Sequence, residues 1–312
     1  MTLTVLKPGM LTTLQSKSRI GMRHLGVPSG GAADSLSLAL ANKLVGNAWH
    51  ETALEVTMLG PALRFDAACA FAIAGAPLEA TLNSEPIACH ATILAEPGDE
   101  LVVGSASAGA RSYIAIAGGF EADDVLGSTS TNLQAEFGGL EGRALQKGDI
   151  LRFSPVETDA LETPAEFIPP FTSSWALRAC ASLETELLED ADALFETNWT
   201  VGQRADRMGL QLESERLVIA SDGRMASAGI FPGAIQCPQD GSPFLLSVDS
   251  GTVGGYPRVG YVAQVDRHML GQLRPGDHVR LLRREPDEAI GELRAKIDYW
   301  REWLPDIEAI LQ

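Results

Sequence analysis

The chain has 312 residues, 41 of them acidic and 24 basic, so its formal net charge at pH 7 is −17. This balance argues against a nucleic-acid-binding protein and a polybasic membrane anchor, because both require clustered lysine and arginine. The 45% content of hydrophobic residues is too high for a disordered chain, and the length suggests two domains.

The sequence near Met1 predicts a cytoplasmic protein. It contains no positively charged segment followed by a long apolar run, which is the pattern of a secretion signal. The longest apolar run, residues 67–76, is far too short to span a membrane. The four cysteines form no C-x-x-C pair, so reduced thiols are expected rather than a zinc or redox site.

The first predicted helix covers residues 35–45. Asp34 precedes it as an N-cap, and Gly46 follows it as a terminating glycine. Beyond this helix, short apolar runs separated by glycine and proline predict a mainly β fold of barrels or sandwiches. Examples of these runs are residues 101–103, 113–117 and 244–248.

A proline-rich segment near the midpoint predicts an interdomain linker. The expected organisation is a first β domain, the linker, a second β domain and a C-terminal helix, at residues 1–154, 155–172, 173–284 and 285–312. Residues 157–196 carry ten acidic side chains and one basic, Arg178. A short helix is predicted over residues 187–195 of this stretch. The acidic stretch could be a docking surface for a basic partner, but a linker and helix face exposed to solvent is the favoured interpretation.

Apolar residues at alternating steps of three and four predict an amphipathic C-terminal helix with a single stripe. The stripe consists of Ile290, Leu293, Ile297, Trp300, Leu304, Ile307 and Leu311. Pro305 is expected to kink or restart the helix. The stripe could bind a partner helix or a second copy of the chain, but packing on its own barrel is the favoured interpretation.

Common catalytic motifs are missing from the sequence. There is no P-loop, no G-x-G-x-x-G, no G-x-S-x-G and no H-E-x-x-H. The five histidines are scattered, so no metal site is expected. Instead, several glycine loops carry arginine, acidic and hydroxyl residues, which suits binding of an anionic or carbonyl oxygen. Each loop taken alone could instead be a structural turn whose arginine pairs with a nearby aspartate or glutamate.

Taken together, nine segments resemble one family in their order along the chain. They are KPGMLTTLQ (7–15), RHLGVP (23–28), GAAD (31–34), AN (41–42), LEV (54–56), GGLEGRAL (138–145), DRMG (206–209), PGAIQ (232–236) and GGYP (254–257). The family is that of biotin-dependent carboxyltransferases, or allophanate hydrolase subunit 2, and the resemblance covers about residues 3–283. It implies two cyclophilin-like β-barrel domains, with a few short helices and the C-terminal helix.

The resemblance also implies amide chemistry in a cytoplasmic heterocomplex. The first hypothesis is the C subunit of an ATP-dependent 5-oxoprolinase, which opens the lactam of 5-oxoproline to glutamate with two partners, a KipI-like (subunit-1) protein and a LamB/YcsF-type protein. The second is a carboxyltransferase that moves a carboxyl group from carboxybiotin to urea or a similar amide. The third is a non-enzymatic, KipA-like antagonist of a KipI-type kinase inhibitor. Since the chain lacks both a P-loop and a Met-Lys-Met biotin site, ATP would act at the level of the complex, and no covalent biotin is expected here.

The candidate site residues come from the matching loops. Arg143 and Arg207 would orient a carboxylate or phosphate, and Asp34, Glu55 or Asp206 could serve as a general base. The expected substrate-binding residues are Arg23, His24, Ser128, Thr131, Gln236 and Tyr256.

Three segments depart from the family pattern. Residues 15–19 read Gln-Ser-Lys-Ser-Arg where Gln-Asp-Leu-Gly-Arg is frequent, Thr129 replaces a frequent arginine, and residues 248–253 replace Asp-Arg-Gln-Thr-Thr. These changes remove two arginines near the presumed substrate loops, and with them two groups that could bind a carboxylate in a bidentate manner.

Overall fold

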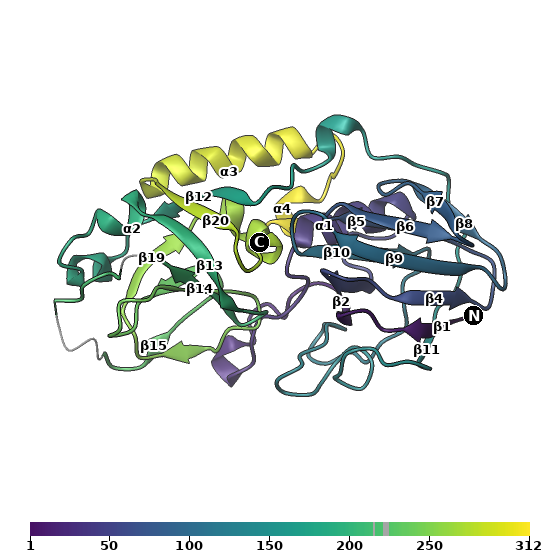
Figure 1. Cartoon of the computed structure of the whole chain (residues 1–312), viewed down its shortest axis with the longest axis horizontal. Helices are drawn as coiled ribbons and strands as arrows, with labels where there is room; N and C mark the ends of the chain where they lie inside the picture. The colour runs from purple at the N-terminus through teal and green to yellow at the C-terminus, as the bar shows by residue number, and fades with distance from the viewer. Residues whose placement is uncertain (215, 221–224) are drawn as a thin grey trace. The chain divides into compact units, whose positions relative to one another are not determined.

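The computed structural model describes residues 1–214, 216–220 and 225–312 and confirms the expected mainly β fold (Figure 1). The chain divides into two compact units. The first consists of Met1–Arg19, Gly30–Phe171 and Trp303–Ile310, and the second of Ile20–Ser29, Thr172–Glu302 and Leu311–Gln312. The proline-rich segment therefore groups with the first unit, and the C-terminal residues do not form a separate body. Within the described residues, no helix is both long and apolar enough to cross a membrane.

The first unit contains two sheets rather than one closed hydrogen-bonded ring. The larger sheet has the order β11-β1-β4-β9-β6-β7, with bounds β1 (Thr2–Lys7), β4 (Ala62–Phe65), β6 (Leu78–Leu82), β7 (Glu85–Ile87), β9 (Glu100–Ala106) and β11 (Ile150–Arg152). The smaller has the order β2-β3-β10-β5-β8, with bounds β2 (Leu11–Gln15), β3 (Ala53–Thr57), β5 (Cys69–Gly75), β8 (Thr92–Ala95) and β10 (Arg111–Ile116). One apolar core lies between them and includes Leu14, Phe65, Phe71 and Ile114.

The smaller sheet is buried on both faces. On β5, Phe71 and Ile73 belong to the core between the sheets, so the alternating residues Ala72 and Ala74 face the other way. Helix α1 (Ser35–Leu44) contacts β5 and β10. Small alanine side chains let the helix approach closely, and this is why β5 is a continuous apolar run rather than an alternating one.

The second unit is a closed barrel with the strand order β12-β19-β16-β17-β14-β13-β20. The bounds are β12 (Ser174–Cys180), β13 (Asn198–Ala205), β14 (Gly209–Glu213), β16 (Ala234–Gln236), β17 (Phe244–Leu246), β19 (Arg258–Val262) and β20 (His278–Arg283). The ring includes one parallel pair, β12 with β20, while its other pairs are antiparallel. A small separate sheet pairs β15 (Ala228–Gly229) with β18 (Val253–Gly254).

The early helix was predicted correctly from its caps. Helix α1 begins after Asp34, whose side chain accepts hydrogen bonds from the first turn, and Gly46 follows its end with a φ of +71°. The helix predicted over residues 187–195 is wrong. The chain instead forms a 3-10 turn, η3 (Leu183–Leu187), and a single α-helical turn, α2 (Ala193–Glu196), because Leu188 is extended and forms a β-bridge with Ile219.

The C-terminal segment forms two helices, α3 (Pro286–Trp300) and α4 (Ile307–Ile310), and Pro305 lies between them as expected. Helix α3 packs on its own barrel, against β12 and the 3-10 segment η4 (Gln264–Gln272), as Figure 1 shows. Its Lys296 Nζ donates a hydrogen bond to the Val265 carbonyl at 2.9 Å. The predicted stripe is only partly covered, since Ile290 is 46% exposed whereas Trp300 is buried.

Candidate functional site

Two of the predicted bases meet in the first unit through a buried tyrosine. Glu55, on β3, is 1% exposed, and its Oε2 accepts hydrogen bonds from the Ala33 backbone N–H and the Tyr113 hydroxyl, both at 2.8 Å. The Glu55 Oε1 lies 3.6 Å from the Arg111 Nε. The Tyr113 hydroxyl oxygen accepts a hydrogen bond from the Asp34 backbone N–H at 2.9 Å. Burial, and then the nearby charges of Glu55 and Asp34, raise the pKa of Tyr113 well above its ordinary value, so the phenol remains a donor.

The Asp34 carboxylate caps α1. Its Oδ1 accepts from the backbone N–H groups of Leu36 and Ser37 at 3.1 Å, and its Oδ2 from the Ser37 hydroxyl at 2.6 Å. The carboxylates of Asp34 and Glu55 therefore both fix the loop that precedes α1. Catalysis by either would require exchanging one of these structural hydrogen bonds for a substrate contact.

The predicted hydroxyl residues line the loop after β2. Ser128 Oγ donates to the Lys17 carbonyl at 2.6 Å, and Thr131 Oγ1 donates to the Leu14 carbonyl at 2.9 Å. Arg19 is 1% exposed, and its Nη2 donates to the Ser128 carbonyl at 3.1 Å. The sequence prediction did not include Arg19, although its guanidinium holds the Ser128 loop in place.

Two of the departures from the family pattern contact one another. Thr129, where an arginine is frequent, donates from its hydroxyl to the Ser16 hydroxyl at 2.9 Å, and Ser16 stands where aspartate is frequent. Thr129 also shares a 2.6 Å hydrogen bond with Thr52. A pair of neutral hydroxyl groups thus occupies the two positions.

Arg143 is engaged by acids of its own unit. Its Nη1 and Nη2 donate to the two carboxylate oxygens of Asp149 at 2.7 and 3.0 Å, and Nη2 also lies 3.0 Å from Glu141. The hydrogen bonds with Asp149 raise the pKa of Arg143. This fork is already occupied, which leaves little of it for a substrate anion.

The same holds for Arg207 in the second unit. Its Nε and Nη2 donate to the two oxygens of Asp249 at 2.7 and 3.2 Å, and both residues are 5% exposed. The neighbouring Asp206 is exposed, and its Oδ1 accepts from the backbone N–H groups of Met208 and Gly209, as in a turn. Asp206 therefore stabilises a turn, and Arg207 forms a buried ion pair with Asp249.

The remaining predicted residues also belong to the second unit. Arg23 lies in a 3-10 turn, η1 (Arg23–Leu25), and its Nη2 binds the carbonyls of Ile230 and Gly251. His24 is exposed, and its Nδ1 lies 2.7 Å from the Gly21 carbonyl. Gln236 is 7% exposed and donates to the carbonyl of the exposed Tyr256 at 3.4 Å.

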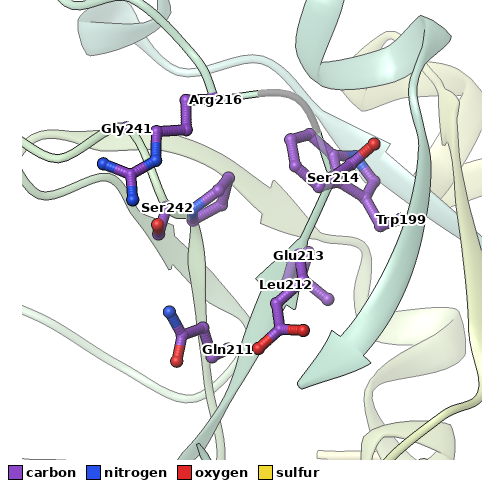
Figure 2. Close-up of a pocket in the computed structure, with 9 residues that line it drawn as sticks. Trp199, Gln211, Leu212, Glu213, Ser214, Arg216, Gly241 and Ser242 are labelled. Carbon is purple, nitrogen blue, oxygen red and sulfur yellow. The ribbon is translucent and has the colours of Figure 1, made fainter.

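A pocket of about 220 Å³ opens in the barrel, and none of the predicted residues lines it. It is lined by Trp199, Gln211, Leu212, Glu213, Ser214, Arg216, Gly241, Ser242 and Pro243. Figure 2 shows Glu213 and Gln211 projecting from β14, with Arg216 beside Gly241 and Ser242. Among the described lining residues, Glu213 and Arg216 are charged. No three His, Cys, Asp or Glu side chains converge as metal ligands among the residues that the structure describes.

Three residues that contact the predicted site residues were not among those predicted from the sequence. They are Tyr113, Arg111 and Asp249, which hold Glu55 and Arg207. Tyr113 begins an apolar run on β10 and Arg111 lies at the start of that strand, whereas Asp249 lies 42 positions from its partner. The only available signal was that acids and arginines recur near the same glycine loops.

A chain with this β architecture and these loops falls in the class of carboxyltransferase domains. Residues 25–283 match the family described as "carboxyltransferase domain, subdomain A and B", and the chain belongs to that family. It is 33% identical over 301 residues to the 5-oxoprolinase C subunit of Escherichia coli K12, covering 96% of each chain. It is 31% identical to the 5-oxoprolinase C subunit of Haemophilus influenzae, covering 92% of this chain and 96% of that one.

The fold is also similar to that of a much longer solved protein. The crystal structure of the urea carboxylase of Kluyveromyces lactis superposes with a TM-score of 0.90 at 28% identity. The match covers 97% of this chain but 29% of the urea carboxylase. The chain therefore corresponds to one part of that protein and to nearly the whole of the bacterial subunits.

Proposed function

We propose that this chain is the C subunit of an ATP-dependent 5-oxoprolinase, which hydrolyses the lactam C–N bond of 5-oxoproline to give glutamate. The observation that carries the proposal is the end-to-end match with the Escherichia coli protein, 96% of each chain. The name of that relative implies further subunits, and we propose a KipI-like protein and a LamB/YcsF-type protein as the two partners.

We also propose that those partners handle ATP, and the two longer helices of this chain support that proposal. A phosphate is usually held by free backbone N–H groups at a helix N-terminus that follows a glycine loop. In this chain Gly30 and Gly31 precede α1, but the Asp34 carboxylate occupies its first N–H groups. The N-terminus of α3 carries a capping box formed by Glu285 and Glu288. Both helices thus present an acid where a phosphate would bind.

The proposal is tested by co-expressing the chain with the KipI-like and LamB/YcsF-type partners and assaying ATP-dependent glutamate release from 5-oxoproline. The expected result is release by the full complex and none by a complex that lacks this chain. A stable complex of all three proteins that forms no glutamate would contradict the proposal.

A second candidate is a carboxyltransferase that acts on urea or a similar amide with a separate biotinyl carrier. The similarity to the urea carboxylase favours it, at a TM-score of 0.90. The two candidates differ in their requirement for biotin. Carboxylation of urea that depends on an added biotinyl carrier and is inhibited by avidin would support this second activity.

A further inference from the structure

Two arginines of the second unit lie against the same short loop, Ile230–Gly233. Arg23 Nη2 donates to the carbonyls of Ile230 and Gly251 at 2.5 and 2.6 Å, and Nη1 donates to the Ser29 hydroxyl at 3.3 Å. All of these partners are neutral. The Arg23 side chain is therefore fixed in place by the loop while its positive charge is not neutralised there.

Arg267, on η4, approaches the loop at its other end. Its guanidinium lies 5.7 Å from the centre of the Phe231 ring, which in turn stacks on Tyr261 with a centroid distance of 5.1 Å. The Arg267 Nε is buried and has no hydrogen-bond partner in the described part of the chain. A Cβ at Gly233 would lie 3.1 Å from this Nε and 3.3 Å from the Arg267 Cγ, so the absence of a side chain at Gly233 lets Arg267 lie close against the loop backbone.

Three described acids of the second unit are paired with other arginines. Asp249 binds Arg207, and Glu184 binds Arg258. Asp266, next to Arg267 in the sequence, instead binds Arg178 at 2.7 Å.

Among the described residues, neither Arg23 nor Arg267 forms an ion pair with a carboxylate. Burial lowers the pKa of both guanidiniums from its ordinary value. A guanidinium nonetheless stays charged at neutral pH. Within the described part of the chain, the loop therefore lies beside two arginines that no carboxylate pairs, in a protein whose net charge is −17.

We propose that Arg23 and Arg267 form an anion site around the Ile230–Gly233 loop, and that this site binds the carboxylate of a small amide or lactam acid. The inference deepens the proposed function, on which its choice of substrate rests. Arg267 is the new binding residue: its N–H groups would donate to the carboxylate, while the cation–π contact with Phe231 at 5.7 Å keeps the guanidinium over that ring. The ligand is thus selected by a carboxylate that urea and simple lactams lack.

The test measures binding to the 312-residue chain by calorimetry, with three probes. They are 5-oxoproline, malonate as a carboxylate unrelated to the reaction, and 2-pyrrolidinone as the same ring without the carboxylate. We expect both carboxylates to bind, and Arg267→Gln to weaken each by about tenfold or more while 2-pyrrolidinone stays weak throughout. Arg267→Lys keeps the positive charge but loses the planar guanidinium, so its carboxylate affinity should lie between those of the wild type and Arg267→Gln.

The matched control is Arg301→Gln, because Arg301 is an exposed arginine of the same unit that pairs with Asp298. Unchanged carboxylate binding in folded Arg267→Gln, or no carboxylate binding by the wild-type chain at about 10 mM, overturns the anion site. If the complex releases glutamate but carboxylate binding does not depend on Arg267, the anion site is refuted and the proposed function stands. An inactive complex whose chain binds malonate through Arg267 refutes the function and leaves the site standing.

Discussion

At the residue scale, an arginine is available for substrate only if no acid of the protein has already engaged it. Arg143 and Arg207 look like anion ligands in the sequence, but Asp149 and Asp249 occupy their forks. Arg23 has the same sequence character but only neutral partners. The difference is invisible in the local sequence, because it depends on which residues the fold brings together.

We predict that Asp249→Ala will destabilise the second unit by about 3–5 kcal/mol, since it leaves Arg207 buried without its charge partner. The double variant Arg207→Met/Asp249→Leu should recover most of that loss, because it removes both charges. Urea denaturation of the three proteins provides the measurement. Equal stabilities of the single and double variants would show that the ion pair is not the cause.

A second prediction concerns the hydroxyl pair of Ser16 and Thr129. Ser16→Asp places a carboxylate at a position that is 4% exposed, and we expect a loss of about 2 kcal/mol or more. Adding Thr129→Arg should restore stability with a coupling energy of about 1–3 kcal/mol, because the two side chains touch. A double-mutant cycle by urea denaturation measures that coupling, and strictly additive losses would contradict the paired replacement.

At the element scale, side chains outside the regular elements decide where those elements begin. Asp34 starts α1, and Ser182 with Thr185 forms a capping box around the short turn η3. From η3, Glu184 reaches Arg258 at the start of β19, with an Nε–Oε2 distance of 3.0 Å. Glu184 thereby connects the turn η3 to strand β19 of the barrel.

The Glu184 pair predicts a pH dependence. The hydrogen bond from Arg258 lowers the pKa of Glu184, so the unfolded chain takes up this proton first as the pH falls. The stabilisation is complete above an unfolded pKa of about 4.3 and is lost as the pH drops through the lower folded pKa. Between pH 7 and 3, Glu184→Gln should therefore lose less stability than the wild type, by on the order of 1 kcal/mol.

Thermal denaturation of both proteins across that pH range measures this difference. Other acids with lowered pKa values, such as Asp66 and Asp99, are present in both chains and cancel in the comparison. Parallel stability curves for wild type and variant would contradict the assignment to Glu184.

At the scale of the whole molecule, the two units are not continuous segments. The first unit includes residues 303–310, and the second includes residues 20–29. In the first unit α4 contacts α1, and Trp303 stacks on Phe167 with a centroid distance of 6.3 Å. Residues 303–310 thus pack within the unit that contains the start of the chain.

This arrangement predicts that a change in α4 affects the first unit. Ile307 is 0% exposed, so Ile307→Ala should cost about 2–5 kcal/mol, whereas the exposed Glu308→Ala should cost little. Hydrogen exchange followed by mass spectrometry should show faster exchange in α1 for Ile307→Ala only. Unchanged protection of α1 in that variant would refute the structural role of α4.

The sequence by itself determined the mainly β class, the capped helix at Asp34, the break at Pro305 and the family, because these depend on local patterns and motif order. It misplaced the helix over residues 187–195, since the extended Leu188 pairs with a distant strand segment. Only the tertiary structure decided which arginines are neutralised and which remain charged beside a loop. Ion pairing depends on distances between residues far apart in the chain, and no local pattern encodes those distances.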